Sequence, residues 1–295
     1  MKTRHEQAIN ALPSELKDFF VNVVGMETFD GRLSATQWQA LLDASMLDDA
    51  QARLALLPLA ASFSIAPVSS FFVGAIVTGF SGTRYFGANM EFHGLGMSQT
   101  VHAEQSAIAH AWSYGETGIS NITINYSPCG HCRQFMNELT QAEQLEIQLP
   151  ERQAMALHDY LPESFGPSDL GQAEGLMAKT TPSFTAESDS PLVKAALEAA
   201  ALSHAPYSKN LSGIALQTRN GNIYTGRYAE NAAFNPSLPP LQVALIQMNM
   251  AGEALADIQS ACMVESENGL VSFLGDCQQL LDKLCPDAPF EYITL

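Results

Sequence analysis

The sequence predicts an α/β protein in which one domain type occurs twice, behind a helical N-terminal segment. The main observation is an internal repeat, because Ala66-Pro67-Val68-Ser69 recurs as Ala205-Pro206-Tyr207-Ser208. Further residues match in the same register: Gly74 with Gly213, Tyr85 with Tyr224, Gly87 with Gly226 and Glu91 with Glu230. A single long repeat of this kind predicts two similar domains, not a solenoid of short units.

The N-terminal segment, residues 1–48, has a helical pattern. Apolar side chains recur at helical spacing from Ile9 to Val23, and Ser34-Ala-Thr-Gln37 has the form of a capping box before another helix. The segment carries no cluster of chemically reactive groups. We therefore assign it to packing.

Each copy is expected to begin with a helix, over residues 51–62 in the first and 192–203 in the second. Strand-like runs follow at 72–77 and 84–86 in the first copy, and at 213–217 and 222–225 in the second. Between the last two, Asn220-Gly221 is a strong hairpin signal. Further strands at 122–125 and 145–148 alternate with helices, which is the pattern of an α/β domain.

These patterns give four segments. Residues 1–48 form an N-terminal helical domain, 49–162 the first copy, 163–189 a linker rich in Gly, Pro, Ser and Thr, and 190–295 the second copy.

The composition bears on partners and location. There are 14 Lys+Arg against 31 Asp+Glu, a formal net charge of -17, so binding to nucleic acid or to an anionic membrane is disfavoured. The most apolar stretch, 54–77, is interrupted by Pro58, Pro67 and Gly74 and is expected to be core, not a membrane span. We see no secretion signal and only 5 cysteines, which predicts a cytoplasmic protein without a disulfide framework.

Three residues have the spacing of a metal site. His102 precedes a helical pattern, and Pro128-Cys129-Gly-His-Cys132 follows a strand. A Cys-x-x-Cys alone is more often redox-active or structural, but with His102 it makes a set of two thiolates and one imidazole that suits Zn²⁺. Three protein ligands leave the fourth tetrahedral position open to water, as in catalytic zinc sites. We expect one zinc ion per chain.

Glu104 indicates the chemistry. It stands two residues after His102, so near a helix start it can lie beside the open position without binding the metal. A carboxylate there can take a proton from water and pass it to a substrate. His-x-Glu followed by Pro-Cys-x-x-Cys is the signature of zinc-dependent nucleobase deaminases. Glu104 is therefore the candidate catalytic residue.

The other three cysteines, Cys262, Cys277 and Cys285, lack the spacing of metal ligands. We expect them to be small buried residues, and their role is undetermined.

On these residues the chain resembles the cytidine deaminases, in the long two-domain dimeric form of enteric and related bacteria. The resemblance covers essentially the whole length and rests on Asn89-Met-Glu91-Phe92 and on residues 100–108, 128–134 and 228–235. It implies a three-layer α-β-α core present twice, once catalytic and once degenerate. It also implies zinc-dependent hydrolysis of cytidine and deoxycytidine to the uracil nucleosides and ammonia, in pyrimidine salvage.

The resemblance also assigns a nucleoside site. By it, Asn89 and Glu91 hydrogen-bond the ribose hydroxyls and Phe71 packs on the pyrimidine, while the Ala103 N–H and the Ser127 carbonyl hold the base edge. Without the resemblance, the sequence alone favours a turn residue at Asn89, a core residue at Phe71 and an exposed surface charge at Glu91.

Arg133, directly after Cys132, is a candidate to hydrogen-bond a thiolate, although a surface role fits its position equally.

The second copy is expected to lack the chemistry. Aligning residues 101–108 with 239–246 puts Pro240 opposite His102 and Gln242 opposite Glu104, and no Cys-x-x-Cys follows. Proline offers no metal ligand, and glutamine cannot accept and return a proton. The resemblance gives this copy a role in a homodimer in which the partner chain completes each site.

The candidates for that contribution from the partner chain are Phe165, Ala233 and Phe234, although Phe165 could equally anchor the linker.

Two alternatives stay open at this point. One is a deaminase of polynucleotides, which the net charge disfavours. The other is a non-catalytic protein that binds nucleosides and keeps a structural zinc, which Glu104 disfavours because a structural site needs no carboxylate beside the water.

Overall fold

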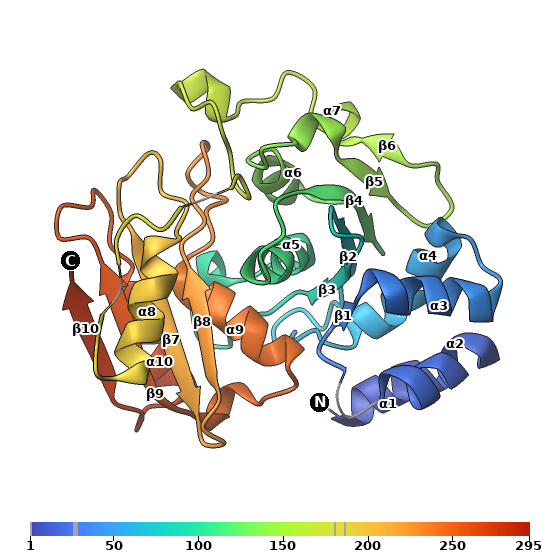
Figure 1. The fold of residues 1–295 in the computed structure, drawn as a ribbon, viewed down its shortest axis with the longest axis horizontal. Helices are drawn as coiled ribbons and strands as arrows, with labels where there is room; N and C mark the ends of the chain where they lie inside the picture. Colours follow the sequence, from blue (N-terminus) through green and yellow to red (C-terminus); the bar gives the residue numbers. More distant parts are fainter. Residues whose placement is uncertain (1, 26–28, 180, 186) are drawn as a thin grey trace. The chain divides into compact units, whose positions relative to one another are not determined.

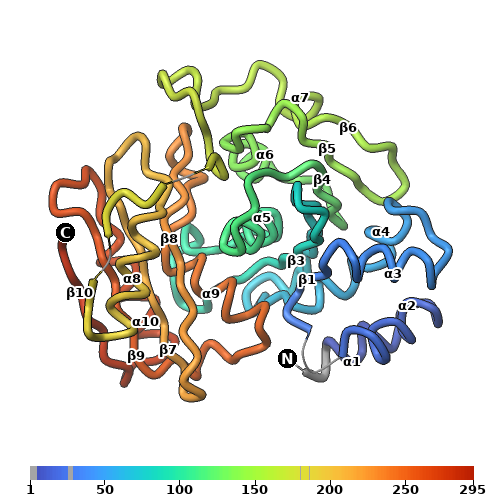
Figure 2. The backbone as a smooth tube through the Cα atoms, in the orientation of Figure 1, coloured from blue at the N-terminus to red at the C-terminus, as the bar shows by residue number. Residues whose placement is uncertain are grey.

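The computed structural model describes residues 2–25, 29–179, 181–185 and 187–295, with side chains from residue 5 onward. The chain forms two compact units (Figures 1 and 2), one of residues 1–164 with 250–252 and one of residues 165–249 with 253–295. Each unit contains one mixed β-sheet with helices. Among the described residues, no helix combines the length and apolar character that crossing a membrane requires.

The first unit holds the N-terminal segment and the first copy. Its sheet has the strand order β1-β3-β2-β4-β5-β6. The elements in chain order are α1 (Lys2–Asn10), α2 (Ser14–Phe19) with a π-helical turn (Phe20–Val24), β1 (Arg32–Leu33), α3 (Ala35–Ser45), α4 (Asp49–Ala61), β2 (Gly74–Gly79), β3 (Arg84–Ala88), α5 (Ala103–Ser113), β4 (Ile119–Ile124), α6 (Gly130–Met136), β5 (Glu146–Gln148), β6 (Met155–Ala156) and α7 (Leu157–Tyr160).

The N-terminal helices share the core of the first copy. The predicted capping box at the start of α3 forms, since the Ser34 N–H donates to Gln37 Oε1 at 3.0 Å and the Gln37 N–H donates to Ser34 Oγ at 3.2 Å. Leu16 and Trp38 are buried in one cluster with Leu56 of α4 and Ile76 of β2. Because residues 1–48 and the first copy share this core, the structure does not set residues 1–48 apart as a domain. The predicted domain boundary after residue 48 stays a prediction.

The second unit repeats the order of elements found in the first copy. Its sheet has the order β10-β9-β7-β8. The elements are a 3₁₀ turn (Pro167–Leu170), α8 (Pro191–Ala201), β7 (Ser212–Thr218), β8 (Ile223–Arg227), α9 (Pro240–Met250), β9 (Ile258–Glu265), α10 (Leu274–Leu284) and β10 (Phe290–Thr294).

Strand pairing is the same in both copies. β2 and β7 each lie between two antiparallel neighbours, and the last pair, β4 with β5 or β9 with β10, is parallel. The predicted pair of similar α/β domains is therefore confirmed.

The glycines of the repeat allow helices to pack closely on both faces of each sheet. A Cβ on Gly74 would lie under 3.0 Å from the backbone of α4, and one on Gly87 would lie equally close to the backbone of α5. Ala75 is paired with Gly87, so those two share a face, and Gly74, next to Ala75, lies on the other. Helices α4 and α5 therefore cover opposite faces, and the equivalent glycines of the second unit approach α8 and α9 in the same way.

The close contact of Gly87 with α5 gives a test. Gly87→Ala should lower the unfolding free energy by about 3 kcal/mol, because the methyl group would overlap helix backbone that cannot move aside cheaply. The control is Gly275→Ala in α10, where the methyl meets open space and removes a helix glycine, so stability should hold or rise by about 1 kcal/mol. Calorimetric melting of both variants measures this. A wild-type melting temperature for Gly87→Ala would contradict the packing argument.

Candidate functional site

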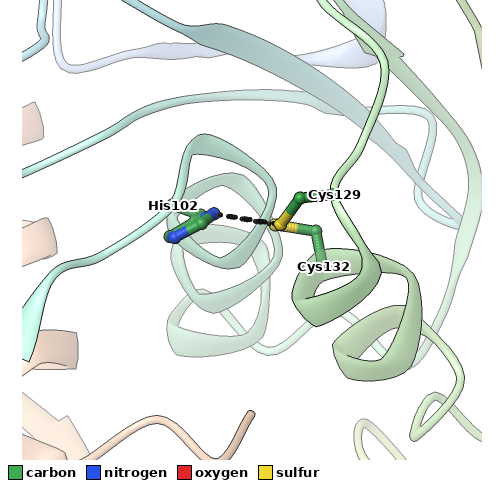
Figure 3. A group of neighbouring side chains, drawn as sticks. All are labelled: His102, Cys129 and Cys132. Carbon is green, nitrogen blue, oxygen red and sulfur yellow. Dashed lines mark hydrogen bonds between the residues drawn. The ribbon is translucent and has the colours of Figure 1, made fainter. Parts of the chain in front are cut away.

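Two helix starts bring the three predicted metal ligands together (Figure 3). His102 is the N-cap residue of α5, Cys129 is the N-cap residue of α6, and Cys132 lies in the first turn of α6. Their ligand atoms all lie within 4.8 Å of one another. Among the residues that the structure describes, this is the group of His, Cys, Asp and Glu side chains found to have that geometry.

The spacing of these atoms fits zinc. His102 Nδ1 lies 3.5 Å from Cys129 Sγ and 3.2 Å from Cys132 Sγ, and the two sulfur atoms are 3.6 Å apart. A tetrahedral zinc with ordinary Zn–S and Zn–N bonds needs edges of about 3.8 Å between sulfurs and about 3.5 Å from sulfur to nitrogen. Two soft sulfur donors and one imidazole also match the preference of Zn²⁺. The residues present therefore fit the ion.

The electrostatics of the three ligands favour a cation between them. Contacts with Cys132 and His102 lower the pKa of Cys129 to about 3, which makes it a thiolate at neutral pH. The hydrogen bond with that thiolate raises the pKa of His102. Metal binding needs the thiolate form of the cysteines, so a low pKa at Cys129 favours it.

Glu104 lies against this centre without belonging to it. It occupies the first turn of α5 and is 4 % exposed. Burial raises the pKa of its carboxyl group, against the opposing effect of its own backbone and of the Cys132 thiol, with which the carboxyl hydrogen-bonds. A buried carboxyl group beside three ligand atoms is placed to exchange a proton with a water in the open position.

A cavity of about 410 Å³ opens beside the ligands. Phe71, 47 % exposed, lies at this cavity with its ring centroid 4.5 Å from that of Tyr126. The cavity is lined by Ser69, Phe71, Val73, Asn89, Glu91, Met97, Thr100, His102, Ala103, Glu104, Tyr126, Ser127 and Cys129. Every residue predicted for the nucleoside site of the first copy therefore lines one cavity.

The polar residues of the cavity are already hydrogen-bonded to the chain. Asn89 accepts from the Val73 N–H at 2.9 Å and donates to the Phe71 carbonyl at 3.0 Å. Glu91 accepts from the Val68 and Ser69 N–H groups, both at 2.9 Å. Although burial acts in the opposite direction, hydrogen bonds from Ser69 and Val68 lower the pKa of Glu91. It is therefore an ionised acceptor at neutral pH.

Sequence reasoning missed several residues of this cavity, namely Ser69, Val73, Met97, Thr100 and Tyr126. In the sequence, the only signal at Ser69 is its place in the repeat, and the only signal at Tyr126 is its position before Ser127. Met97, 66 % exposed, lies in a 3₁₀ turn that no sequence pattern indicates.

The expectation that Arg133 reaches a thiolate is not met. Its Nε donates to the Pro128 carbonyl at 2.8 Å, its Nη1 to the Tyr160 carbonyl at 2.9 Å, and its Nη2 lies 3.4 Å from Ser127 Oγ. A planar guanidinium has several donors in one plane, so it can bind these groups together. Arg133 thus ties the segment before Cys129 to the end of α7.

The residues predicted to act from a partner chain belong to the second unit. Phe165 is 46 % exposed and Phe234 is 64 % exposed, with Phe234 at a φ of 62°. Ala233 is also exposed. These side chains are accessible for an intermolecular contact, and their predicted role is not tested by the geometry of one chain.

The structure corrects the alignment of the second copy by one residue. Gly87 faces Ala103 and Ala107, whereas the equivalent Gly226 faces Pro240 and Ala244. The position of His102 is therefore taken by Pro239 and that of Glu104 by Leu241, not by Pro240 and Gln242. The sequence alone does not determine this register, because it depends on which strand residue each helix packs against.

The second copy also lacks the sulfur ligands. The first helical hydrogen bond of α6, from the Arg133 N–H to the Cys129 carbonyl at 3.0 Å, has its equivalent in α10, from the Cys277 N–H to the Phe273 carbonyl at 2.8 Å. Phe273 thus takes the position of Cys129, and Asp276 that of Cys132.

A buried carboxylate fills this region of the second copy. Glu265, 1 % exposed, accepts hydrogen bonds from four donors: Asn210 Nδ2 at 2.9 Å, the Phe273 N–H at 2.8 Å, Ser272 Oγ at 2.7 Å and Tyr292 Oη at 3.1 Å. These bonds satisfy the polar groups internally.

Two family models, both described as the cytidine and deoxycytidylate deaminase zinc-binding region, match the chain, one over residues 48–145 and the other over residues 157–277. The chain is 57% identical to the cytidine deaminase of Vibrio vulnificus strain YJ016 and 55% identical to that of Vibrio parahaemolyticus, over 100% of each chain. The solved cytidine deaminase of Burkholderia pseudomallei is 28% identical, over 39% of this chain and 97% of its own, with a TM-score of 0.35.

Fold, donor set and cavity define a zinc-dependent deaminase. The full-length relatives and the matches to two family models show that the chain belongs to the cytidine deaminase family, in its long bacterial form. The predicted family and the predicted zinc cofactor are both confirmed.

The contacts of Arg133 give a test of its role in tying the segment before Cys129 to the end of α7. Arg133→Lys should raise KM for cytidine about tenfold with zinc retained, because one ammonium group cannot hold both carbonyls and the Ser127 segment loosens. The control is the exposed Arg152→Lys, which should leave KM unchanged. Steady-state kinetics and metal analysis decide. Loss of zinc with an unchanged KM would instead favour a contact with the thiolates.

Proposed function

We propose that the chain hydrolyses cytidine and deoxycytidine to uridine and deoxyuridine with release of ammonia, as a step of pyrimidine salvage. One observation carries the proposal: Glu104, buried and outside the ligand set, lines the same cavity as His102 and Cys129, and that cavity is large enough for a nucleoside. A structural zinc site would have no use for this carboxylate.

His102, Cys129 and Cys132 would hold the zinc ion, with Nδ1 as the imidazole donor. When bound, the ion supplies Lewis acidity and lowers the pKa of a coordinated water toward neutrality. Two thiolates contribute negative charge that offsets the charge of the ion.

Glu104 moves the protons. Its carboxylate accepts a proton from the water that attacks C4 of the pyrimidine and delivers that proton to N3. Attack makes C4 tetrahedral. The proton of the new hydroxyl group then passes through Glu104 to the amino nitrogen, which leaves as ammonia while the C4 carbonyl forms. The atoms balance as one water consumed and one ammonia released.

The remaining cavity residues orient the nucleoside. Asn89 and Glu91 lie where they can read the sugar hydroxyls, and Phe71 offers a ring face to the pyrimidine. The backbone N–H of Ala103 and the carbonyl of Ser127, two residues that line the cavity, hold the polar edge of the base. A free base lacks the sugar hydroxyls and so loses those contacts.

The second copy serves as scaffold and not as a second catalytic site. Pro239, Leu241 and Phe273 at the equivalent positions support this, because none of them can bind zinc or carry a proton. We propose that this copy forms a homodimer and that Phe165, Ala233 and Phe234 complete the site of the partner chain. The enzyme is expected to act in the cytoplasm.

The role of Glu104 has a direct test. Glu104→Gln should lower kcat for cytidine about 10³- to 10⁴-fold, because an amide cannot accept and return a proton, and should retain one zinc per chain. The exposed Glu143→Gln serves as the control and should keep wild-type kinetics. Absorbance assays on cytidine, deoxycytidine and a single-stranded oligonucleotide measure turnover. Activity within tenfold of wild type would refute the role, and turnover of the oligonucleotide alone would favour a polynucleotide deaminase.

The shared active site is tested by mixing two inactive chains. Each homodimer of Glu104→Gln, and each of Phe234→Ser, should have little activity. In the mixed dimer, the chain with Glu104 receives an intact Phe234 from its partner, so one complete site forms. Random exchange of equal amounts should restore about a quarter of wild-type activity, since half of the dimers are mixed.

Two outcomes would contradict the shared site: no recovery on mixing, or full activity of Phe234→Ser by itself. Unmixed variants taken through the same subunit exchange are the control.

A further inference from the structure

The turn that precedes Phe71 is held by a carboxylate of the cavity. Glu91 Oε2 accepts from the Val68 and Ser69 N–H groups at 2.9 Å each, and Glu91 Oε1 accepts from the Ser69 hydroxyl. Glu91 is 6 % exposed. Most of its hydrogen-bonding capacity is therefore spent on the chain itself.

Ser69 connects Glu91 to Phe71 through hydrogen bonds. Its Oγ accepts from the Phe71 N–H at 3.0 Å, so the hydroxyl links Glu91 to the backbone of Phe71. Between them Ser70 has a φ of 54°, in the left-handed region that non-glycine residues occupy only when their surroundings hold them there. The turn thus has a costly conformation that these hydrogen bonds stabilise.

The second copy contains the same turn. Glu230 Oε2 accepts from the Tyr207 N–H at 2.7 Å and from the Ser208 N–H at 3.0 Å, and Lys209 has a φ of 58°. Ser208 Oγ accepts from the Asn210 N–H at 3.3 Å, as Ser69 does from Phe71. Because the equivalents of His102, Cys129 and Glu104 are absent there, this turn persists for its geometry and not for the reaction.

The two copies differ in what the turn presents. In the second copy Asn210 stands in the place of Phe71 and donates to the buried Glu265 at 2.9 Å. In the first copy Phe71 is 47 % exposed at the cavity, and Asn89 donates to its carbonyl at 3.0 Å. Apart from its contact with Tyr126, at 4.5 Å between ring centroids, this half-exposed ring is not enclosed, so its direction also depends on how firmly its backbone is held.

From these observations we propose that Glu91 and Ser69 act as a positioning pair that orients Phe71 toward the pyrimidine, in addition to any contact of Glu91 with the sugar. The inference rests on the proposed function and deepens it. Ser69→Ala separates the two roles of Glu91, because it removes the link to Phe71 and leaves the carboxylate with both of its N–H donors.

The experiment compares five variants by steady-state kinetics on cytidine: Ser69→Ala, Ser69→Thr, Phe71→Leu, the double variant and a control in the second copy. Ser69→Ala should raise KM five- to tenfold with kcat within twofold, since the loss weakens binding and leaves Glu104 and the zinc ligands in place. Ser69→Thr keeps a hydroxyl and should keep KM within twofold. In a Phe71→Leu background, Ser69→Ala should change KM less than twofold, because the ring that it positions is gone.

Ser208→Ala is the matched control, since it removes the same hydroxyl from the same turn in the copy without zinc ligands. It should lower the melting temperature about as much as Ser69→Ala and leave KM within twofold. An unchanged KM for Ser69→Ala, an equal rise for Ser208→Ala, or the same factor in the Phe71→Leu background would each overturn the proposal. Absence of cytidine turnover by the wild type would instead refute the proposed function.

Discussion

The site depends on the meeting of two helix N-termini, those of α5 and α6, which follow the interior strands β3 and β4. His102 begins α5 and Cys129 begins α6, so the distance between these helix starts decides whether three ligand atoms can share one ion. The contact of Gly87 with α5 fixes one start, and the strand β4 before α6 fixes the other. The start of α5 also positions Glu104. Glu104 lies in the first turn of this helix, two residues after the ligand His102. A centre with two thiolates and a buried carboxylate is therefore a property of the fold as much as of the side chains.

Duplication shows which parts of this arrangement belong to the scaffold. Both copies keep the glycines under the helices, the turn held by Glu91 or Glu230, and the strand order. The second copy has lost each metal ligand and has placed Glu265 among four donors in the corresponding region. Features that both copies keep are required for folding, and features found only in the first copy are required for the reaction. Glu91 belongs to both groups, because it holds the shared turn and also lines the cavity.

Much of this could be predicted from the sequence because the signals were local or repeated. The His-x-Glu and Cys-x-x-Cys spacings, the offset glycines and the Asn220-Gly221 turn all act over short distances, and the structure contains the corresponding elements. Three things could not be predicted. The alignment of α9 with α5 depends on which strand residue each helix packs against. In the structure Pro239, not Pro240, is equivalent to His102. The three contacts of Arg133 require a fold that brings Tyr160 near Pro128. Tyr126 and Met97 reach the cavity from segments without any periodic pattern.

The most direct test of the central claim is X-ray absorption at the zinc edge of the purified protein, combined with its zinc content. We predict one zinc per chain with two sulfur neighbours at about 2.3 Å and two nitrogen or oxygen neighbours at about 2.0–2.1 Å, the fourth neighbour being exchangeable water. Four protein ligands, more than two sulfur neighbours, or two zinc ions per chain would contradict it, because each would mean that the metal is structural or that the second copy also binds it.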